Sequence, residues 1–413
     1  MTKVLENNKK FNFIFVVLVL SLFISIRFET QLVIIRPFDL LTVIIFLYVL
    51  SRKEITEKIS SGFYYIFPFL IFHALSALSL GANNFLRESL QVGLIIIFAF
   101  IITKLKSQIN YKKIIYYLLL GTIFFMILII AWHITNNFWV GWKHLPDSRL
   151  LFTSVPIFLF AYLNATETNQ NQKFKIFIIL VGLFSILLMS GERKAIVVFL
   201  FLFLMHYTYD SPLKAIITVV LAYSILVLLS NIIDNEYIAR ILTSLVNISG
   251  TSNVDFALQT GAVQTGDTFS NLQRVFVFNI SKELFLENPI IGLGTNKFIL
   301  VLKNEFYYVP NFMKGGVHSE FLRILVENGL IGLFLYLIIW YKSWTRTRQV
   351  LMYARINQLI SKRQAVFLQY SIYITLALYV GTEASSTRSF IILMMISILP
   401  DYLIHYFKKD LSK

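Results

Sequence analysis

Long apolar runs separated by short polar connections dominate the chain. A membrane-spanning helix needs about 20 mainly apolar residues, because the hydrocarbon core of a bilayer is about 30 Å thick. Twelve apolar runs approach or reach this length, at residues 11–26, 38–50, 63–80, 88–103, 114–134, 150–164, 174–190, 195–209, 213–230, 324–341, 365–380 and 389–407. The pattern predicts an all-α polytopic membrane protein with about twelve transmembrane helices.

One long polar segment, residues 231–322, interrupts the series of apolar runs. Its Gly-, Ser-, Thr- and Asn-rich stretches are typical of irregular loops. Between Asn271 and Glu287 apolar residues recur at helical spacing, which predicts an amphipathic helix that ends before Pro289. The sequence therefore predicts a membrane domain of about nine spans (1–230), a loop domain (231–322) and a second membrane domain of about three spans (323–413).

The composition agrees with a membrane protein. Of the 413 residues 57% are hydrophobic, and the mean hydropathy is +0.71. The net charge of +15 would suggest nucleic acid in a soluble protein, but here it favours contact with the bilayer, and we expect no nucleic-acid partner. The absence of cysteine excludes disulfide and thiolate chemistry, and the six histidines show no metal-binding spacing, so we expect no metal or cofactor.

Lysine and arginine are distributed unevenly over the two sides of the predicted membrane domain. Alternate connections and the two termini hold 22 of them, and the opposite short connections hold 8. The positive-inside rule places the richer set in the cytoplasm. Both termini are then predicted to be cytoplasmic, the first span to be an uncleaved helix, and residues 231–322 to lie outside the cytoplasm.

Charged residues gather at the outer ends of the predicted spans, and His318 is one of them. It follows Gly315 and Gly316, which permit unusual backbone conformations and close approach of a ligand, and it stands near a predicted helix N-terminus. Its imidazole titrates near neutrality, so it can accept or donate a proton. A lone histidine is nevertheless more often a hydrogen-bonded structural residue.

Arg193 and Lys194 lie in the turn between two short predicted spans, where two cations in a partly dry cavity are costly without an anion. A phosphate or diphosphate ligand matches the arginine fork. The alternatives are pairing with Glu192 or extension of both side chains to the lipid headgroups. Arg149 and Arg274 are weaker candidates. A simple interface anchor explains Arg149 equally well, and an exposed arginine such as Arg274 is solvated far more often than it is functional.

Glu327, Gly329 and Gly332 follow on the predicted helix after His318. Glu327 lies about 13 Å further along it and is therefore not expected to bond to His318 directly. We expect it to bond to backbone or to a neighbouring span, and the two glycines to allow close helix packing.

Together with Leu322, these residues fall at the spacing H-x3-L-x4-E-x-G-x2-G, which resembles a motif of the bacterial O-antigen ligase and polymerase superfamily. The resemblance extends over about residues 140–400. Arg274 occupies the place of the family's upstream arginine. Three further pieces carry the resemblance, namely Asp147-Ser-Arg149-Leu, Met189-Ser-Gly-Glu-Arg193-Lys-Ala and Asn288-Pro-Ile-Ile-Gly-Leu-Gly-Thr-Asn-Lys-Phe298. The chain departs from the family at Gly191-Glu192, where the pattern has x-Ser.

The resemblance implies a GT-C-like membrane glycosyltransferase of polysaccharide or lipopolysaccharide biosynthesis. Such an enzyme takes its glycan from undecaprenyl diphosphate and works without metal at the outer face of the bacterial cytoplasmic membrane. His318 would be the catalytic base, and the diphosphate would be held by Arg193, Arg274, Arg149 and Lys194. A ligase would use a lipid core as acceptor and a polymerase a lipid-linked repeat unit, and the sequence leaves both open. A polysaccharide exporter or flippase and a non-catalytic membrane scaffold remain as alternatives.

Overall fold

The structure is a computed structural model, and it describes residues 11–18, 21, 28–29, 34–51, 61–105, 124, 127, 217, 266–306, 317, 319–382 and 386–411. These residues are almost entirely helical. The exception among them is a short antiparallel pair of strands, β1 (Phe28–Glu29) and β2 (Ile34–Ile35), which the sequence did not predict. The helical class of the described part confirms the coarse prediction from the apolar runs.

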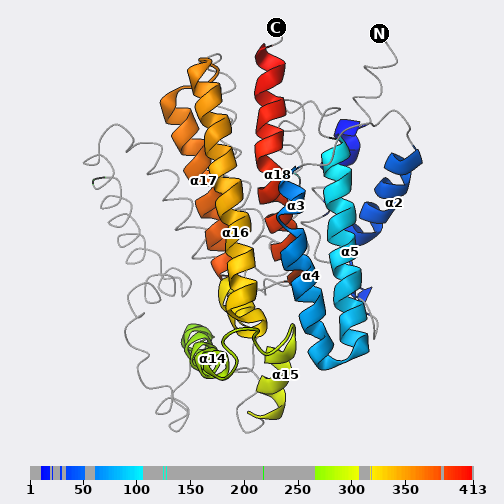
Figure 1. Cartoon of the computed structure of the whole chain (residues 1–413), viewed down its shortest axis with the longest axis vertical. Helices are drawn as coiled ribbons and strands as arrows, with labels where there is room; N and C mark the ends of the chain where they lie inside the picture. The colour runs from blue at the N-terminus through cyan, green and yellow to red at the C-terminus, as the bar shows by residue number, and fades with distance from the viewer. Residues whose placement is uncertain are drawn as a thin grey trace.

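The helices form a bundle with two further helices at one end (Figure 1). The helices of the bundle are α2 (Pro37–Ser51), α5 (Ala82–Leu105), α16 (Glu320–Ile356), α17 (Lys362–Thr382) and α18 (Ser386–Leu411), and the segment before α5 is divided into α3 (Ser61–Tyr64), α4 (Phe67–Ser76) and η1 (Ala77–Leu80). α16 is central, because it packs against α4, α17 and α18. α14 (Gly266–Glu287) and α15 (Lys297–Asn304) lie at the end of the bundle opposite the C-terminal end of α18 (Figure 1).

Three helical segments among the described residues are long and apolar enough to cross a membrane: Gly62–Leu80, Ala82–Leu105 and Glu320–Ile356. All three contain apolar runs predicted from the sequence. The third is longer than its predicted run, 324–341, because polar turns extend it at both ends. With 37 residues α16 is longer than the about 20 residues needed to cross the hydrocarbon core of a bilayer.

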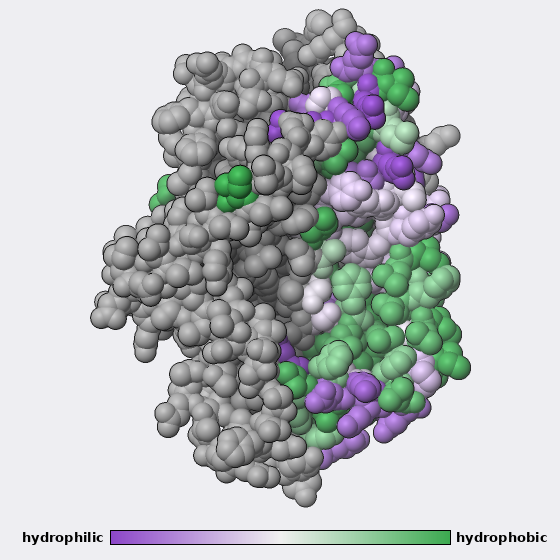
Figure 2. All heavy atoms as spheres, turned by 90° about the vertical axis from the view of Figure 1, so that its left-hand side faces the viewer, coloured by the Kyte–Doolittle hydropathy of each residue, from purple (hydrophilic) through white to green (hydrophobic). Residues whose placement is uncertain are grey.

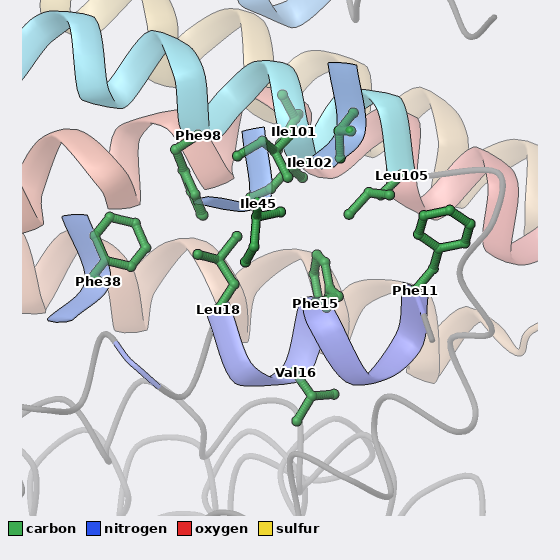
Figure 3. Packing of buried hydrophobic residues seen from close by; sticks show 12 residues of the cluster. Phe11, Phe15, Val16, Leu18, Phe38, Ile45, Phe98, Ile101, Ile102 and Leu105 are labelled. Atoms are coloured by element: carbon green, nitrogen blue, oxygen red, sulfur yellow. The ribbon is translucent and has the colours of Figure 1, made fainter. Parts of the chain in front are cut away.

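The core near the N-terminus joins helical residues 11–18 to α2 and α5 (Figure 3). Phe15 and Leu18 lie beside Ile45 of α2 and Ile101 of α5 in one apolar cluster. The opposite side of α2 is also apolar, with Leu40, Ile44 and Leu47 exposed. A helix that is apolar on all sides is typical of a span whose outer face contacts lipid.

The outer surface has the same organisation. Figure 2 shows a hydrophobic region between hydrophilic side chains at the two ends of the described part of the molecule. A soluble protein rarely exposes so large an apolar area. The surface therefore indicates a bilayer around the middle of the bundle.

Candidate functional site

The amphipathic helix predicted at 271–287 is confirmed as α14, which begins earlier, at Gly266, and ends at Glu287 as expected. Its buried residues Val277, Ile280 and Leu284 form one cluster with Val317 and with Val326 of α16. α15 contributes to the same cluster, so the apolar cluster fixes α14, α15 and the entry of α16 against one another.

α16 begins at Glu320, and Ser319 is its N-cap, with the hydroxyl accepting a hydrogen bond from the Leu322 amide (3.4 Å). This confirms the helix N-terminus predicted beside His318. His318 itself, Gly315 and Gly316 lie outside the described residues. The two neighbours of His318 are described: Val317 is 3% exposed in the cluster shared with α14, and Ser319 caps α16. The chain on both sides of His318 is therefore held at the junction of α14 and α16.

α16 is broken at Gly329, whose backbone is non-helical (φ 64°, ψ −165°). The break frees the amides of Leu330 and Ile331 and the carbonyls of Val326 and Glu327, which would pair with each other in a regular helix. The loop after α14 satisfies all four groups. The Leu330 amide donates to the Pro289 carbonyl (2.9 Å) and the Ile331 amide to the Ile290 carbonyl (3.2 Å). In the other direction, the Leu293 amide donates to the Val326 carbonyl (3.0 Å) and the Gly294 amide to the Glu327 carbonyl (2.8 Å).

We call this exchange between residues 289–294 and 326–331 the backbone interlock. It requires glycine at two places where the two backbone segments touch. Gly292 (φ +73°) would place a Cβ 2.5 Å from the Glu327 carbonyl carbon, and a Cβ on Gly329 would overlap the Ile290 carbonyl. No L side chain fits either position, since positive φ is also unfavourable for them. Two sequence pieces that resemble the same family are thus one structural unit.

Gly332 has a different role, which agrees with the predicted close packing of helices. A Cβ there would lie 2.2 Å from the Asn328 Cβ, one turn earlier on α16, and 3.4 Å from the Phe72 ring of α4. α16 and α4 are in contact over this region. The prediction for Gly329 was less accurate, because it accommodates a loop rather than a helix.

Arg323, Glu320 and Glu327 form a buried cluster on the first turns of α16. The Arg323 guanidinium donates to Glu320 through Nε (3.0 Å) and Nη2, and to Glu327 through Nη1 (2.8 Å). Glu320 is fully buried, and Arg323 and Glu327 are 7% and 3% exposed. Glu327 was expected to bond to backbone or to a neighbouring span, and its carboxylate does accept a hydrogen bond from the backbone of Asn296. It also bonds to Arg323, one turn earlier on its own helix, which was not expected.

A second polar group joins α4 to α16 and to the loop before α15. Asn328 lies with its Oδ1 3.1 Å from His73 Nδ1, and its amide donates to Ser76 Oγ (2.6 Å) and to Thr295 Oγ1 (3.1 Å). Thr295 donates in turn to the His73 carbonyl (2.8 Å). His73, Thr295 and Asn328 are fully buried. Each of these side chains thus has at least one hydrogen-bond partner within the group, as buried polar groups generally do.

Glu88 of α5 extends this group to a third helix. Its Oε1 accepts from the Asn296 side chain (2.6 Å), and its Oε2 lies 3.5 Å from His73 Nε2. Both ring nitrogens of His73 therefore face oxygen atoms of neighbouring side chains. We call the six residues the polar network: His73, Ser76, Glu88, Thr295, Asn296 and Asn328.

The sequence analysis missed the polar network. His73 and Glu88 stand within or at the edge of apolar runs, and an ionisable residue in a span is a usual sign of function or of a buried partner. His73 and Glu88 could therefore have been singled out from the sequence. Asn296 and Asn328 carry no comparable sign, because their importance comes from neighbours that are distant in sequence.

Arg274 occupies the other face of α14. Its side chain is exposed, and among the described residues it has no ion-pair partner, whereas Val277 and Leu284 point into the core. Arg323 differs from it, because three of its hydrogen-bond donors are used by glutamates. Arg274 is thus free to meet an anion and Arg323 is not. Arg149, Arg193 and Lys194, the other predicted anion ligands, lie outside the described residues.

The charge of the buried groups limits what they can bind. Glu88, Glu320 and Glu327 bring three carboxylates, and Arg323 brings one guanidinium. A diphosphate would be repelled by such a set. The polar network and the Arg323 cluster therefore stabilise the framework, and an anionic substrate requires the cations outside them.

Comparison with known families gives one match. A sequence model of the O-antigen ligase family matches residues 178–337, a range that includes α14, α15, the backbone interlock and the first half of α16. A search of curated proteins found no match. Residues 178–337 are therefore similar to the O-antigen ligase family, as the motif pieces indicated, and the described part of the chain is helical with three segments long and apolar enough to cross a membrane.

Proposed function

We propose that this protein transfers a glycan from an undecaprenyl-diphosphate-linked donor to a saccharide acceptor at the outer face of the bacterial cytoplasmic membrane. Glycan transfer in general follows from the family, and the donor, the acceptor and the side of the membrane are part of the proposal. The proposal includes residues 231–322 as an outer domain between two membrane domains. The observation that carries it is the backbone interlock, which ties α14 and its loop to the helix that follows His318.

In the proposed reaction the acceptor hydroxyl oxygen attacks the anomeric carbon of the donor sugar. The bond from that carbon to the diphosphate oxygen breaks, and the lipid diphosphate leaves with the electron pair. His318 takes the hydroxyl proton, a role that contributes roughly 10²–10⁴-fold to rate. No metal takes part, because arginine and lysine offset the charge on the leaving diphosphate.

Arg193, Arg274, Arg149 and Lys194 are proposed to hold that diphosphate. A guanidinium remains charged at any working pH and offers paired donors to phosphate oxygens. The exposed, unpaired state of Arg274 in the described part supports its role. Glu327, Gly329 and Gly332 act indirectly by fixing α16, and Gly315 and Gly316 give the backbone before His318 the freedom to approach a ligand.

The test is replacement of His318 in the native host, followed by gel analysis of the surface glycan. His318→Ala is expected to abolish glycan transfer at normal membrane levels, and His318→Gln to do the same because the amide cannot accept the proton. His405→Ala is the matched control, since His405 lies on α18 near its C-terminal end, away from α14. Unchanged glycan in the His318 variants would contradict the mechanism and favour an exporter or a scaffold.

The type of defect distinguishes the two transfer reactions. Loss of long chains with a single repeat still attached indicates a polymerase. Loss of all attached glycan, with polymer accumulating on the carrier lipid, indicates a ligase. Arg274→Ala should reduce the same product strongly, whereas Lys282→Ala, which removes an exposed cation from the same helix, should not.

A further inference from the structure

A pocket of about 320 Å³ opens between α16 and α17, at the end of the bundle away from α14 and α15 (Figure 1). Residues of α16 at helical spacing form one wall, and the first turns of α17 form the other. We call it the cationic pocket and define it by Trp344, Arg348, Arg355, Lys362, Gln369 and Tyr370. None of its lining residues belongs to the proposed glycan-transfer site.

The pocket holds positive charge that no acidic side chain offsets. Arg348, Arg355 and Lys362 are exposed, and no aspartate or glutamate lines the pocket. None of the three forms an ion pair with a described residue. Arg346 on the same helix is different, because it bonds to Asp401 of α18 (2.8 Å). Three like charges around one pocket repel each other, and a bound anion removes that repulsion.

Gln369 supplies an independent indication of a ligand. Its side chain is 8% exposed and lines the pocket, and its buried Nε2 makes no hydrogen bond within the described part of the protein. A buried donor without an acceptor is unfavourable. An oxygen atom of an anion in the pocket would accept from it.

The remaining lining residues favour a lipid over a free anion. Trp344 and Tyr370 pack edge to face, with ring centroids 5.2 Å apart. Trp and Tyr concentrate at the level of the lipid headgroups. Leu351, Met352 and Val366 add apolar surface beside the cations. The pocket thus combines a place for a phosphate with a place for the glycerol and upper acyl chain.

We propose that the cationic pocket binds an anionic phospholipid. Arg348, Arg355 and Lys362 surround its phosphate, Gln369 donates a hydrogen bond to a phosphate oxygen, and Trp344 and Tyr370 contact the start of the acyl chains. The bound lipid connects α16 to α17 across the short connection between them. Basic pockets between spans bind anionic headgroups in this way.

The test uses the full-length protein in mild detergent and native mass spectrometry with phosphatidylglycerol, phosphatidylcholine or inorganic phosphate. Wild type should bind phosphatidylglycerol in preference to both others. The triple variant Arg348→Gln/Arg355→Gln/Lys362→Gln should bind it about a hundredfold more weakly, because each cation near a lipid surface contributes roughly a fivefold factor. The matched control is Lys282→Gln/Lys297→Gln/Lys303→Gln, which removes the same charge from α14 and α15.

Two outcomes would overturn the proposal: equal loss of binding in both triple variants, and binding of inorganic phosphate as tight as that of phosphatidylglycerol. Gln369→Leu tests whether misfolding, rather than loss of contact with the lipid, explains weaker lipid binding. It should weaken lipid binding several-fold while its melting temperature without lipid is unchanged or higher, because it removes a buried donor that has no acceptor. A lower melting temperature with unchanged lipid binding would show that Gln369 is only structural.

Discussion

At the end of the bundle near α14, Arg323 is buried and bonded to two glutamates, whereas at the opposite end Arg348 and Arg355 are exposed around an open pocket without acidic neighbours. The first region also contains the polar network and the backbone interlock, in which each freed backbone group has a partner. The comparison teaches that buried charge gives the first region a fixed shape, and exposed charge gives the second an affinity for anions.

Removal of the buried Arg323 guanidinium should cause the largest loss of stability. Arg323→Met leaves Glu320 and Glu327 buried without a partner, and breaking such a pair costs about 3–5 kcal/mol. Arg346→Met, which separates the partly exposed pair with Asp401, should cost roughly 1 kcal/mol. Thermal melting of the purified variants in detergent measures both.

A triple variant tests whether the unpaired carboxylates cause the loss of stability in Arg323→Met. Adding Glu320→Gln and Glu327→Gln to Arg323→Met removes the unpaired carboxylates and should recover most of the lost melting temperature. If the triple variant melts as low as the single one, the packing of Arg323, for example beside the Phe390 ring, matters more than its charge.

The second largest loss of stability is expected from a change in the backbone interlock. Gly329→Ala forces a side chain into a left-handed conformation and against the Ile290 carbonyl, so about 3 kcal/mol of stability should be lost. Gly93→Ala is the control, because a Cβ in that helical position meets no atom within 4 Å. It should be neutral or stabilise α5 by up to about 1 kcal/mol.

Melting curves and glycan gels together separate two roles of the interlock. We expect Gly329→Ala to lose both stability and glycan transfer, since α16 carries the entry beside His318. A variant that transfers glycan normally despite a lower melting temperature would show that the interlock stabilises the fold without positioning the site.

The polar network should give the smallest of these effects. Asn328→Leu removes the buried hydrogen bonds of the Asn328 side chain to His73, Ser76 and Thr295, which costs about 2 kcal/mol. The exposed Asn357 also bonds through its amide, to the Tyr353 carbonyl (2.9 Å), yet Asn357→Ala should change stability by no more than about 0.5 kcal/mol. Equal melting shifts for the two variants would contradict the importance of burial.

The sequence by itself determined the class of the protein, because the length of an apolar run is set by bilayer thickness alone. It also determined α14, whose end at Glu287 follows from Pro289, and the start of α16 beside His318. These features depend on residues that are neighbours in the chain. Local patterns therefore predict them.

Only the tertiary structure decided how the distant pieces meet. The role of Gly329 depends on a loop about forty residues earlier, and Asn328 is satisfied by His73, 255 positions away. No periodicity in the sequence encodes such contacts, since each results from packing that brings separate helices together. The sequence indicated that Glu327 would bond to backbone or to a neighbouring span, but only the packing of the loop before α15 against α16 decided that the backbone partner is Asn296. Burial of both side chains on one face of α16 added Arg323 as its second partner.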